Sequence, residues 1–304
     1  MAKKPKTASQ SKDVPAMQTD LYRAIEGMQS NESLVLANYY PLPFDAEEVN
    51  SCVIEVKSFP DRTEWAPILQ LPLLVQSITR LSAGGFLLSS DDGTLIKVIN
   101  DTIEEIPLSL SSSITAIWER ATDDYWICHG TGLVHWDGRQ TLSGALKKGQ
   151  IFALHSLGPD FAIAVGEAGM VLAFDGQRWN EIDSVPTNKV LNGVVCVSPN
   201  EIYISGWQGV LYKWDGKAQW QKIKYVGDVD GSEFSGGSLA YYDGTVYLCA
   251  DEYGLYRIAG KKAEAVETFF ASRAMVVHDK LIITGENKWN EYDGNEWIQV
   301  DMSL

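Results

Sequence analysis

A turn motif that recurs along the chain constrains the fold more than any other feature of the sequence. In its clearest copies an aromatic residue precedes Asp-Gly, and a Trp and then an Ile or Val follow, as in the segment 174–182. The copies are anchored at positions 61, 101, 137, 175, 215, 259 and 293. A spacing of 34 to 44 residues, in a chain of short β-rich runs, is typical of repeats that each form one small sheet.

Each copy has the residues of a four-stranded antiparallel unit. Around Asp175, the runs 151–154, 161–165 and 170–174 are apolar and β-rich, and Trp179 begins a fourth run. Asp-Gly supplies the positive φ of a tight hairpin between the third and fourth runs. Such units bury their faces only against their neighbours, so the array must close into a ring. The sequence therefore predicts an all-β, seven-bladed β-propeller over residues 33–304, or six blades if residues 33–68 form something else.

At this level the chain resembles the β-propeller superfamily over residues 33–304. The Asp-Gly-x-x-Trp hairpins resemble those of Asp-box (BNR-like) and related irregular propellers, although the full Asp-box pattern Ser-x-Asp-x-Gly-x-Thr-Trp is absent. WD-type repeats are a looser likeness, because no Gly-His and Trp-Asp pair recurs. The resemblance implies the fold but no single activity, because propellers include enzymes, lectins and scaffolds.

The region before residue 33 has a different pattern. Residues 1–14 are rich in Lys, Ser and Pro, which predicts a disordered tail. For residues 15–30 we expect a short N-terminal helix that begins at Pro15 and packs on the main domain. The helix prediction rests on one apolar stripe at helical spacing, formed by Met17, Leu21, Ala24, Ile25 and Met28.

Charge and composition limit the partners. The 304 residues hold 25 Lys and Arg against 40 Asp and Glu, for a net charge of −15. A phosphate backbone would be repelled, so no nucleic acid and no membrane surface is expected as a direct ligand. A basic protein, which includes the case of a toxin domain, suits this charge, and the chain on its own is expected to be a monomer.

Other features of the sequence indicate a cytoplasmic location. No run of 18 apolar residues occurs, and the polar N-terminus is not followed by an apolar signal region. Cys52, Cys128, Cys196 and Cys249 each lie in a short apolar run without Cys-x-x-Cys spacing. That pattern favours buried, reduced thiols over a zinc site or disulfides.

Residue patterns for chemistry are few. His129 and His135 flank one turn, but no further ligand completes a metal-site spacing with them. Asp228-Val229-Asp230-Gly231 lacks the remaining ligands of a calcium loop. Neither a nucleophile elbow nor a Walker loop is present, and none of the eight arginines occupies a repeated funnel position. The sequence thus predicts a non-enzyme with no metal and no cofactor, and no arginine cluster for acidic sugars.

Loop order predicts where a partner binds. If the four strands of each blade are called a to d outward from the axis, the b–c and d–a loops share one rim of a propeller. We expect an acidic rim there, in which aromatic and amide side chains interleave. The predicted partner-binding residues are Asp91, Asp92, Glu167, Trp207, Gln208, Asp228, Asp230, Glu233, Asp251, Glu252, Tyr253, Glu286 and Trp289. The opposite rim should collect the basic residues Arg62, Arg139, Arg178, Lys217, Lys261 and Lys262.

Three functional hypotheses follow. The first is a protein-binding propeller without enzymatic activity, in its sharpest form an intracellular inhibitor or immunity protein that neutralises a basic toxin, such as a nuclease, through the acidic rim. The second is a carbohydrate-binding or glycoside-hydrolysing propeller. It would use Trp207 or Trp289 and a carboxylate pair drawn from Asp91/Asp92, Asp123/Asp124 or Asp251/Glu252. The third is an assembly scaffold with a neutral partner.

Overall fold

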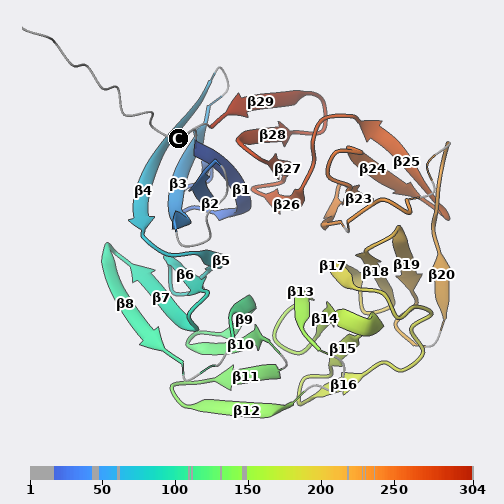
Figure 1. Ribbon diagram of the computed structural model, residues 1–304, viewed down its shortest axis with the longest axis horizontal. Coiled ribbons are helices and arrows are strands. Elements are labelled where there is room, and N and C mark those ends of the chain that lie inside the picture. The colour runs from blue at the N-terminus through green and yellow to red at the C-terminus, as the bar shows by residue number, and fades with distance from the viewer. Residues whose placement is uncertain are drawn as a thin grey trace, which may run out of the picture.

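Seven small antiparallel sheets surround a central axis in the computed structural model (Figure 1). The structure describes residues 17–42, 48–59, 62–108, 110, 112–130, 132–145, 149–217, 219–227, 229, 231–235 and 237–302. The predicted disordered tail, residues 1–14, lies outside the described residues. The seven-bladed prediction is confirmed, because the region 33–68 contributes to a blade and the six-bladed alternative is excluded.

The first three blades each consist of four consecutive strands. Blade 1 contains β1 (Met17–Glu26), β2 (Glu32–Pro41), β3 (Asn50–Ser58) and β4 (Thr63–Leu71). Blade 2 contains β5 (Val75–Arg80), β6 (Phe86–Ser90), β7 (Thr94–Ile99) and β8 (Thr102–Pro107). Blade 3 contains β9 (Ile114–Ala121), β10 (Asp124–His129), β11 (Gly132–Trp136) and β12 (Gln140–Ala145).

The last four blades follow the same order. Blade 4 contains β13 (Ile151–Ser156), β14 (Ala162–Gly166), β15 (Val171–Phe174) and β16 (Trp179–Glu181), with the short 3-10 turn η2 (Glu167–Gly169). Blade 5 contains β17 (Leu191–Ser198), β18 (Glu201–Gly206), β19 (Val210–Trp214) and β20 (Trp220–Lys222). Blade 6 contains β22 (Leu239–Tyr242), β23 (Thr245–Cys249), β24 (Leu255–Ala259) and β25 (Lys262–Glu267), and β21 (Lys224–Tyr225) pairs with β25 in parallel. Blade 7 contains β26 (Arg273–Val277), β27 (Lys280–Gly285), β28 (Lys288–Tyr292) and β29 (Trp297–Asp301).

The hydrophobic core is divided among the contacts between blades. In the described part of the chain, seven clusters of buried side chains each join two neighbouring blades. Between blades 3 and 4, for example, Trp126 packs against Phe174 with ring centroids 5.6 Å apart. Each blade thus depends on both neighbours for the burial of its faces, as the repeat pattern predicted.

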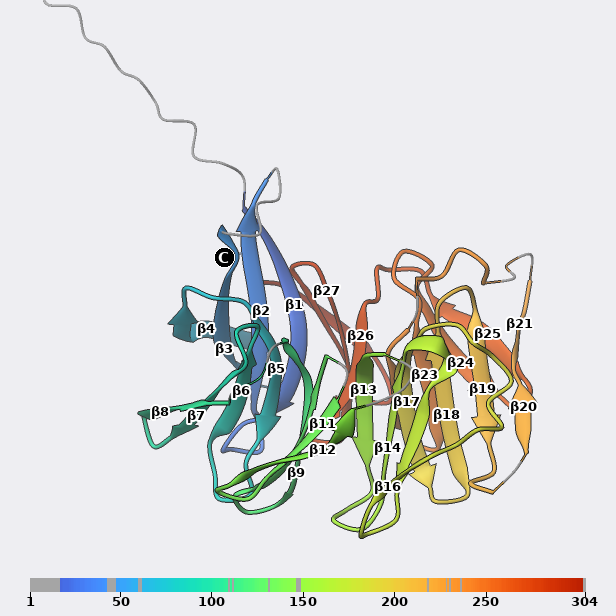
Figure 2. The same ribbon diagram turned by 60° about the horizontal axis from the view of Figure 1, so that its bottom comes forward.

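Ring closure between blades 1 and 7 uses packing rather than exchange of a strand. All four strands of blade 1 come from the start of the chain, and all four of blade 7 from its end (Figures 1 and 2). Leu21 packs with Trp289 and other buried residues of blade 7 in one cluster. The Leu21 backbone N–H donates to the Glu286 carbonyl at 2.8 Å, and a ring nitrogen of His278 lies 2.6 Å from the Glu32 carbonyl oxygen.

The predicted N-terminal helix is wrong, because most of that segment is strand β1. A β-bulge between Leu21 and Arg23 explains the error. Thr19 and Leu21 are buried at strand spacing, the bulge adds one residue, and Ala24 is the next buried position. The three-residue step from Leu21 to Ala24 therefore imitates a helical turn. As a result the first blade begins at Met17 rather than at residue 33. No helix in the described residues is long and apolar enough to span a membrane.

Candidate functional site

The b–c and d–a loops meet at one end of the ring, as predicted, and the set of both is here called the b–c rim. In blades 2, 4 and 5, a backbone hydrogen bond joins the b–c loop to the d–a loop that precedes the blade. Asp91 donates its N–H to Leu74 O at 3.0 Å, Glu167 to Gln150 O at 2.9 Å, and Trp207 to Val190 O at 3.0 Å. The side chains of the b–c loops are therefore presented from backbone that is tied to two blades at once.

Most of the predicted partner-binding residues lie on this rim and face solvent. Asp91, Asp92, Trp207, Gln208, Glu233, Glu252 and Glu286 are exposed, and Glu167, Asp251 and Tyr253 are half-buried. Among these residues Trp207 is a large aromatic side chain with half of its surface accessible to solvent. Asp228 and Asp230 lie outside the described residues.

Trp289 is a correction to the predicted site. The b–c loop of blade 7 is short, so strand β28 has already begun at Lys288. Trp289 then points into the blade 1–blade 7 cluster and is fully buried. A side chain in this position stabilises ring closure and cannot contact a partner at the rim.

Hydrogen bonds within the b–c rim fix several of its acidic side chains. The Tyr253 hydroxyl donates to Glu233 Oε2 at 2.5 Å, which raises the pKa of Tyr253 to about 12. The Ser235 hydroxyl donates to Asp251, whose backbone has a φ of 48° and bridges to Ala271. These contacts hold one acidic and aromatic group in place over blade 6.

Blades 2 and 4 hold their rim acids in a similar way. The Ser90 hydroxyl and the Thr94 N–H both donate to Asp92, and these hydrogen bonds lower the pKa of the Asp92 carboxyl. Glu167 accepts the N–H of Gln150 at 3.2 Å. Hydrogen bonds of this kind favour the charged carboxylate over its protonated form.

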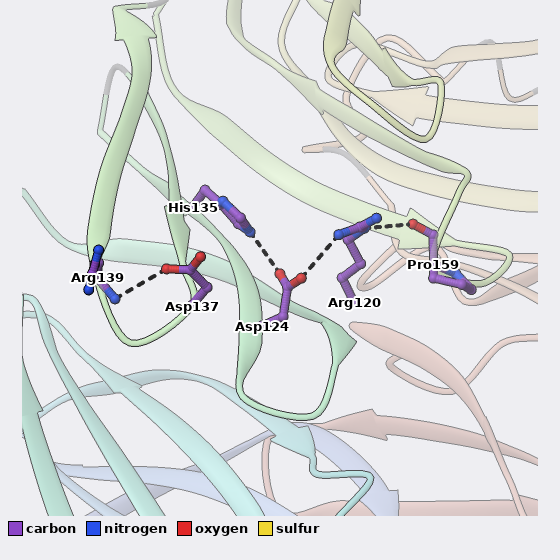
Figure 3. A network of polar contacts seen from close by, with 6 residues as sticks. All are labelled: Arg120, Asp124, His135, Asp137, Arg139 and Pro159. Carbon is purple, nitrogen blue, oxygen red and sulfur yellow. Dashed lines mark hydrogen bonds and ion pairs between the residues drawn. The ribbon is translucent and has the colours of Figure 1, made fainter.

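The rim acids differ from the other acidic residues in their lack of cationic partners. Among the described residues, Asp91, Asp92, Glu167, Glu233, Asp251, Glu252 and Glu286 form no ion pair. Toward the opposite rim, by contrast, Asp124 lies between Arg120 at 3.0 Å and His135 at 2.8 Å (Figure 3). Within the described residues, the carboxylates of the b–c rim are thus not paired with cationic side chains.

The opposite rim is less basic than the sequence suggested. Its c–d turns carry Asp175, Asp215 and Asp293, whose carboxylates accept backbone N–H groups of their own turns. Arg178 lies 3.9 Å from Asp175, and Arg62 pairs with Glu64 at 2.7 Å. Cations and anions therefore alternate there, and the charge segregation between the rims comes from the acidic side.

The central channel is a second polar site. A cavity of about 710 Å³ is lined by residues from the innermost strand of every blade, namely β1, β5, β9, β13, β17, β22 and β26. Arg23, Arg80 and Arg273 lie in its wall, and Glu26 is the acidic residue among its lining. The sequence predicted no arginine cluster for acidic sugars, yet three arginines line this channel. They come from unrelated positions of three blades, so the repeat gave no signal for them.

The two histidines that the sequence places on one hairpin do not form a site together. His135 bonds Asp124 near one end of blade 3, whereas His129 lies at the other end and contacts Ser112. Asp123 pairs with Lys97 at 2.5 Å. Across the described residues, no three His, Cys, Asp or Glu side chains gather as metal ligands do.

Comparisons with known proteins support the fold and give one curated relative. No family model matches the chain. A curated relative, the Immune protein Tsi7 of Pseudomonas aeruginosa, is 24% identical over 192 residues, which is 61% of this chain. The match spans 58% of the length of that relative.

Solved structures show the fold alone, at 11–12% identity. The WD40 β-propeller domain of Doa1 has a TM-score of 0.65 and covers 88% of this chain and 94% of its own. A chain of the Mitotic Checkpoint Complex has a TM-score of 0.62, with 96% and 97% covered. U3-55K has a TM-score of 0.61, with 92% and 95% covered. The β-propeller resemblance is thus confirmed as a fold, and the specific likeness to Asp-box motifs stays a prediction.

Proposed function

We propose that this protein is an immunity protein, without enzymatic activity, that binds a basic toxin through the b–c rim and neutralises it. The observation that carries the proposal is the set of carboxylates on this rim that form no ion pair among the described residues. The likeness to a protein named as an immune protein gives independent support. A cytoplasmic location belongs to the proposal, and it suits four buried, unpaired cysteines.

Electrostatics explains how such a rim would recognise its partner. Carboxylates without cationic partners present their negative charge to an approaching cation, which speeds association at low salt. Asp91, Glu252 and Glu286 stand on blades 2, 6 and 7, so the charge extends around a large part of the ring. A basic surface laid across the rim would meet several of them together.

Trp207 would supply the apolar contact. It is half-exposed and stands where the b–c rim meets the mouth of the channel. Large aromatic side chains near the centre of an interface often contribute most of the binding energy. Its indole would be covered by the toxin, while the carboxylates around it set orientation.

Capture from a lysate of the native organism tests this proposal. We expect the immobilised protein to retain a basic protein at low salt and to release it at high salt. The double variant Asp91→Lys, Glu252→Lys should lose at least tenfold in affinity for it, because each change replaces attraction by repulsion. The matched control is Glu105→Lys, Glu296→Lys, which changes the net charge equally at exposed positions away from the rim.

A growth assay then separates inhibition from simple binding. The captured protein, expressed alone, should arrest growth, and co-expression of the wild-type chain should restore it. Protection by the rim variant as strong as by the wild type would overturn the proposal. Retention that does not depend on salt would instead indicate the scaffold hypothesis, and binding of glycans without a protein partner would indicate the carbohydrate hypothesis.

A further inference from the structure

The wall of the central channel has the opposite charge to the protein as a whole. The chain carries a net charge of −15, yet the residues that line the channel include three arginines and one glutamate. Neither Lys nor Asp is present among the described lining residues. Three of the eight arginines of the chain thus line one cavity, which reaches the acidic rim at Trp207.

Arg23 and Arg273 form the centre of this cationic wall. They lie on β1 and β26, neighbouring inner strands of blades 1 and 7, and Arg273 stacks over the Tyr22 ring at 4.9 Å. Within the described chain, the guanidinium group of Arg23 makes no hydrogen bond or ion pair, and that of Arg273 donates only to the Ser272 carbonyl and hydroxyl. The Arg23 side chain is exposed in the channel, and the positive charge of Arg273 lies close enough to repel it. An anion placed between the two guanidinium groups would relieve this repulsion.

Further donors face the same space. Arg80, at the end of β5, donates to the Gly27 carbonyl and leaves the rest of its guanidinium for a ligand. Burial, and then the charge of Arg23, lower the pKa of His155 to about 4, so its ring is neutral at pH 7. The Cys196 N–H donates to His155 Nδ1 at 3.3 Å, which leaves the ring proton on Nε2 as a donor.

We propose that the central channel is a binding site for a small polyvalent oxyanion, a free molecule that carries phosphate or carboxylate groups. Arginine forks recognise both groups through paired N–H donors. A cavity of about 710 Å³ falls within the range of roughly 300–1,000 Å³ that is common for small-molecule sites. Tyr22, Phe152 and Trp207 line the same cavity and would contact an organic part of the ligand.

Calorimetric titration at constant ionic strength tests the proposal, with pyrophosphate and citrate as separate probes and sodium chloride as the reference. We expect saturable binding of at least one probe to the wild-type protein, and a matching rise in melting temperature. Arg23→Gln should weaken that binding about tenfold or more. Because Arg23 bonds to no other side chain, this variant should fold normally.

The matched control is Arg178→Gln, which removes one positive charge from a side chain that is 80% exposed on the opposite rim. Its affinity for the probe should equal that of the wild type. Binding of neither probe above the chloride reference would overturn the proposal, as would equal weakening in the two variants. No toxin takes part in these titrations, so a failure here leaves the proposed function to be judged by the rim variants alone.

Discussion

In the Asp-Gly turns, the aspartate and the glycine each stabilise the turn in a different way. In the turn at Asp175, the carboxylate accepts the backbone N–H groups of Gln177 and Arg178, and Gly176 has a φ of 92°. Positive φ at the second position is unfavourable for residues with a Cβ. The aspartate therefore satisfies the N–H groups of the turn, while the glycine allows the chain to reverse.

Two of these glycines allow the cost of a positive φ to be distinguished from the cost of a steric clash. Gly138 and Gly216 have φ values of 90° and 75°. A Cβ on Gly138 would meet open space, whereas one on Gly216 would collide with the Pro199 carbonyl oxygen. We expect Gly138→Ala to lower the free energy of unfolding by about 1 kcal/mol and Gly216→Ala by about 3 kcal/mol or more. Urea denaturation followed by tryptophan fluorescence measures both, and equal losses would show that the Pro199 contact is unimportant.

At the scale of elements, strand β1 makes many of the contacts that close the ring between blades 1 and 7. Its residues contact blade 7 through backbone and side chains, and no strand from the end of the chain pairs into blade 1 within the described residues. Leu21, with 2% of its surface exposed, packs at this seam beside Val277 and Trp289. The seam therefore depends on apolar packing that other propellers can reinforce with a shared sheet.

Truncation of Leu21 tests this dependence. We expect Leu21→Ala to lower the free energy of unfolding by about 2–4 kcal/mol, because the transfer energy of the side chain is lost and a cavity remains. Leu157→Ala is the control, because the side chain of Leu157 is 39% exposed in an a–b loop and its truncation should cost under about 1 kcal/mol. Chemical denaturation gives both values, and similar losses would contradict a special role for the seam.

The same elements show what sequence can and cannot predict here. Seven blades follow from the period of the turn motif, because a tight hairpin between the third and fourth strands favours Asp-Gly, and four of the seven anchors have it. The spacing of apolar residues gave a wrong prediction at β1, because the extra residue of the bulge makes the strand resemble an amphipathic helix. The rim acids could be placed from loop order alone. Trp289 could not, since its orientation depends on the length of a single loop.

The arginines of the channel were missed for a different reason. Arg80 ends its inner strand, Arg273 begins another, and Arg23 follows a bulge. No period relates these positions, so only the closed ring shows that they face one cavity. Convergence of this kind depends on tertiary structure and leaves no local pattern in a single sequence.

On the scale of the whole molecule, the two rims and the central channel differ in their charge. In the described part of the chain, carboxylates without ion pairs lie on the b–c rim, paired charges occupy much of the opposite rim, and arginines line the central channel. An excess of negative charge on the outside repels small anions at long range, yet salt screens this repulsion beyond about 10 Å. A ligand that reaches the channel would then meet the uncompensated guanidinium groups at short range, where the attraction is strongest.

We also expect the blades to unfold together, because each packs on both of its neighbours. The reactivity of the buried cysteines can be used to measure this. Cys52, Cys128, Cys196 and Cys249 are buried in blades 1, 3, 5 and 6. Burial raises the pKa of Cys52 to about 11 and that of Cys196 to about 12, and raises those of Cys128 and Cys249 further. The native thiols should therefore stay unreactive toward iodoacetamide at pH 8, because alkylation requires the thiolate and access to it.

Labelling across a urea series then measures cooperativity. Each of these thiols belongs to a cluster shared by two blades, so opening one blade removes burial from both of its neighbours. We expect all four cysteines, followed separately by peptide mass spectrometry, to become labelled with one common midpoint that matches the loss of tryptophan fluorescence. Labelling of Cys52 at lower urea than the others would contradict this expectation, because it would mean that the seam of blades 1 and 7 opens while the remaining blades stay folded.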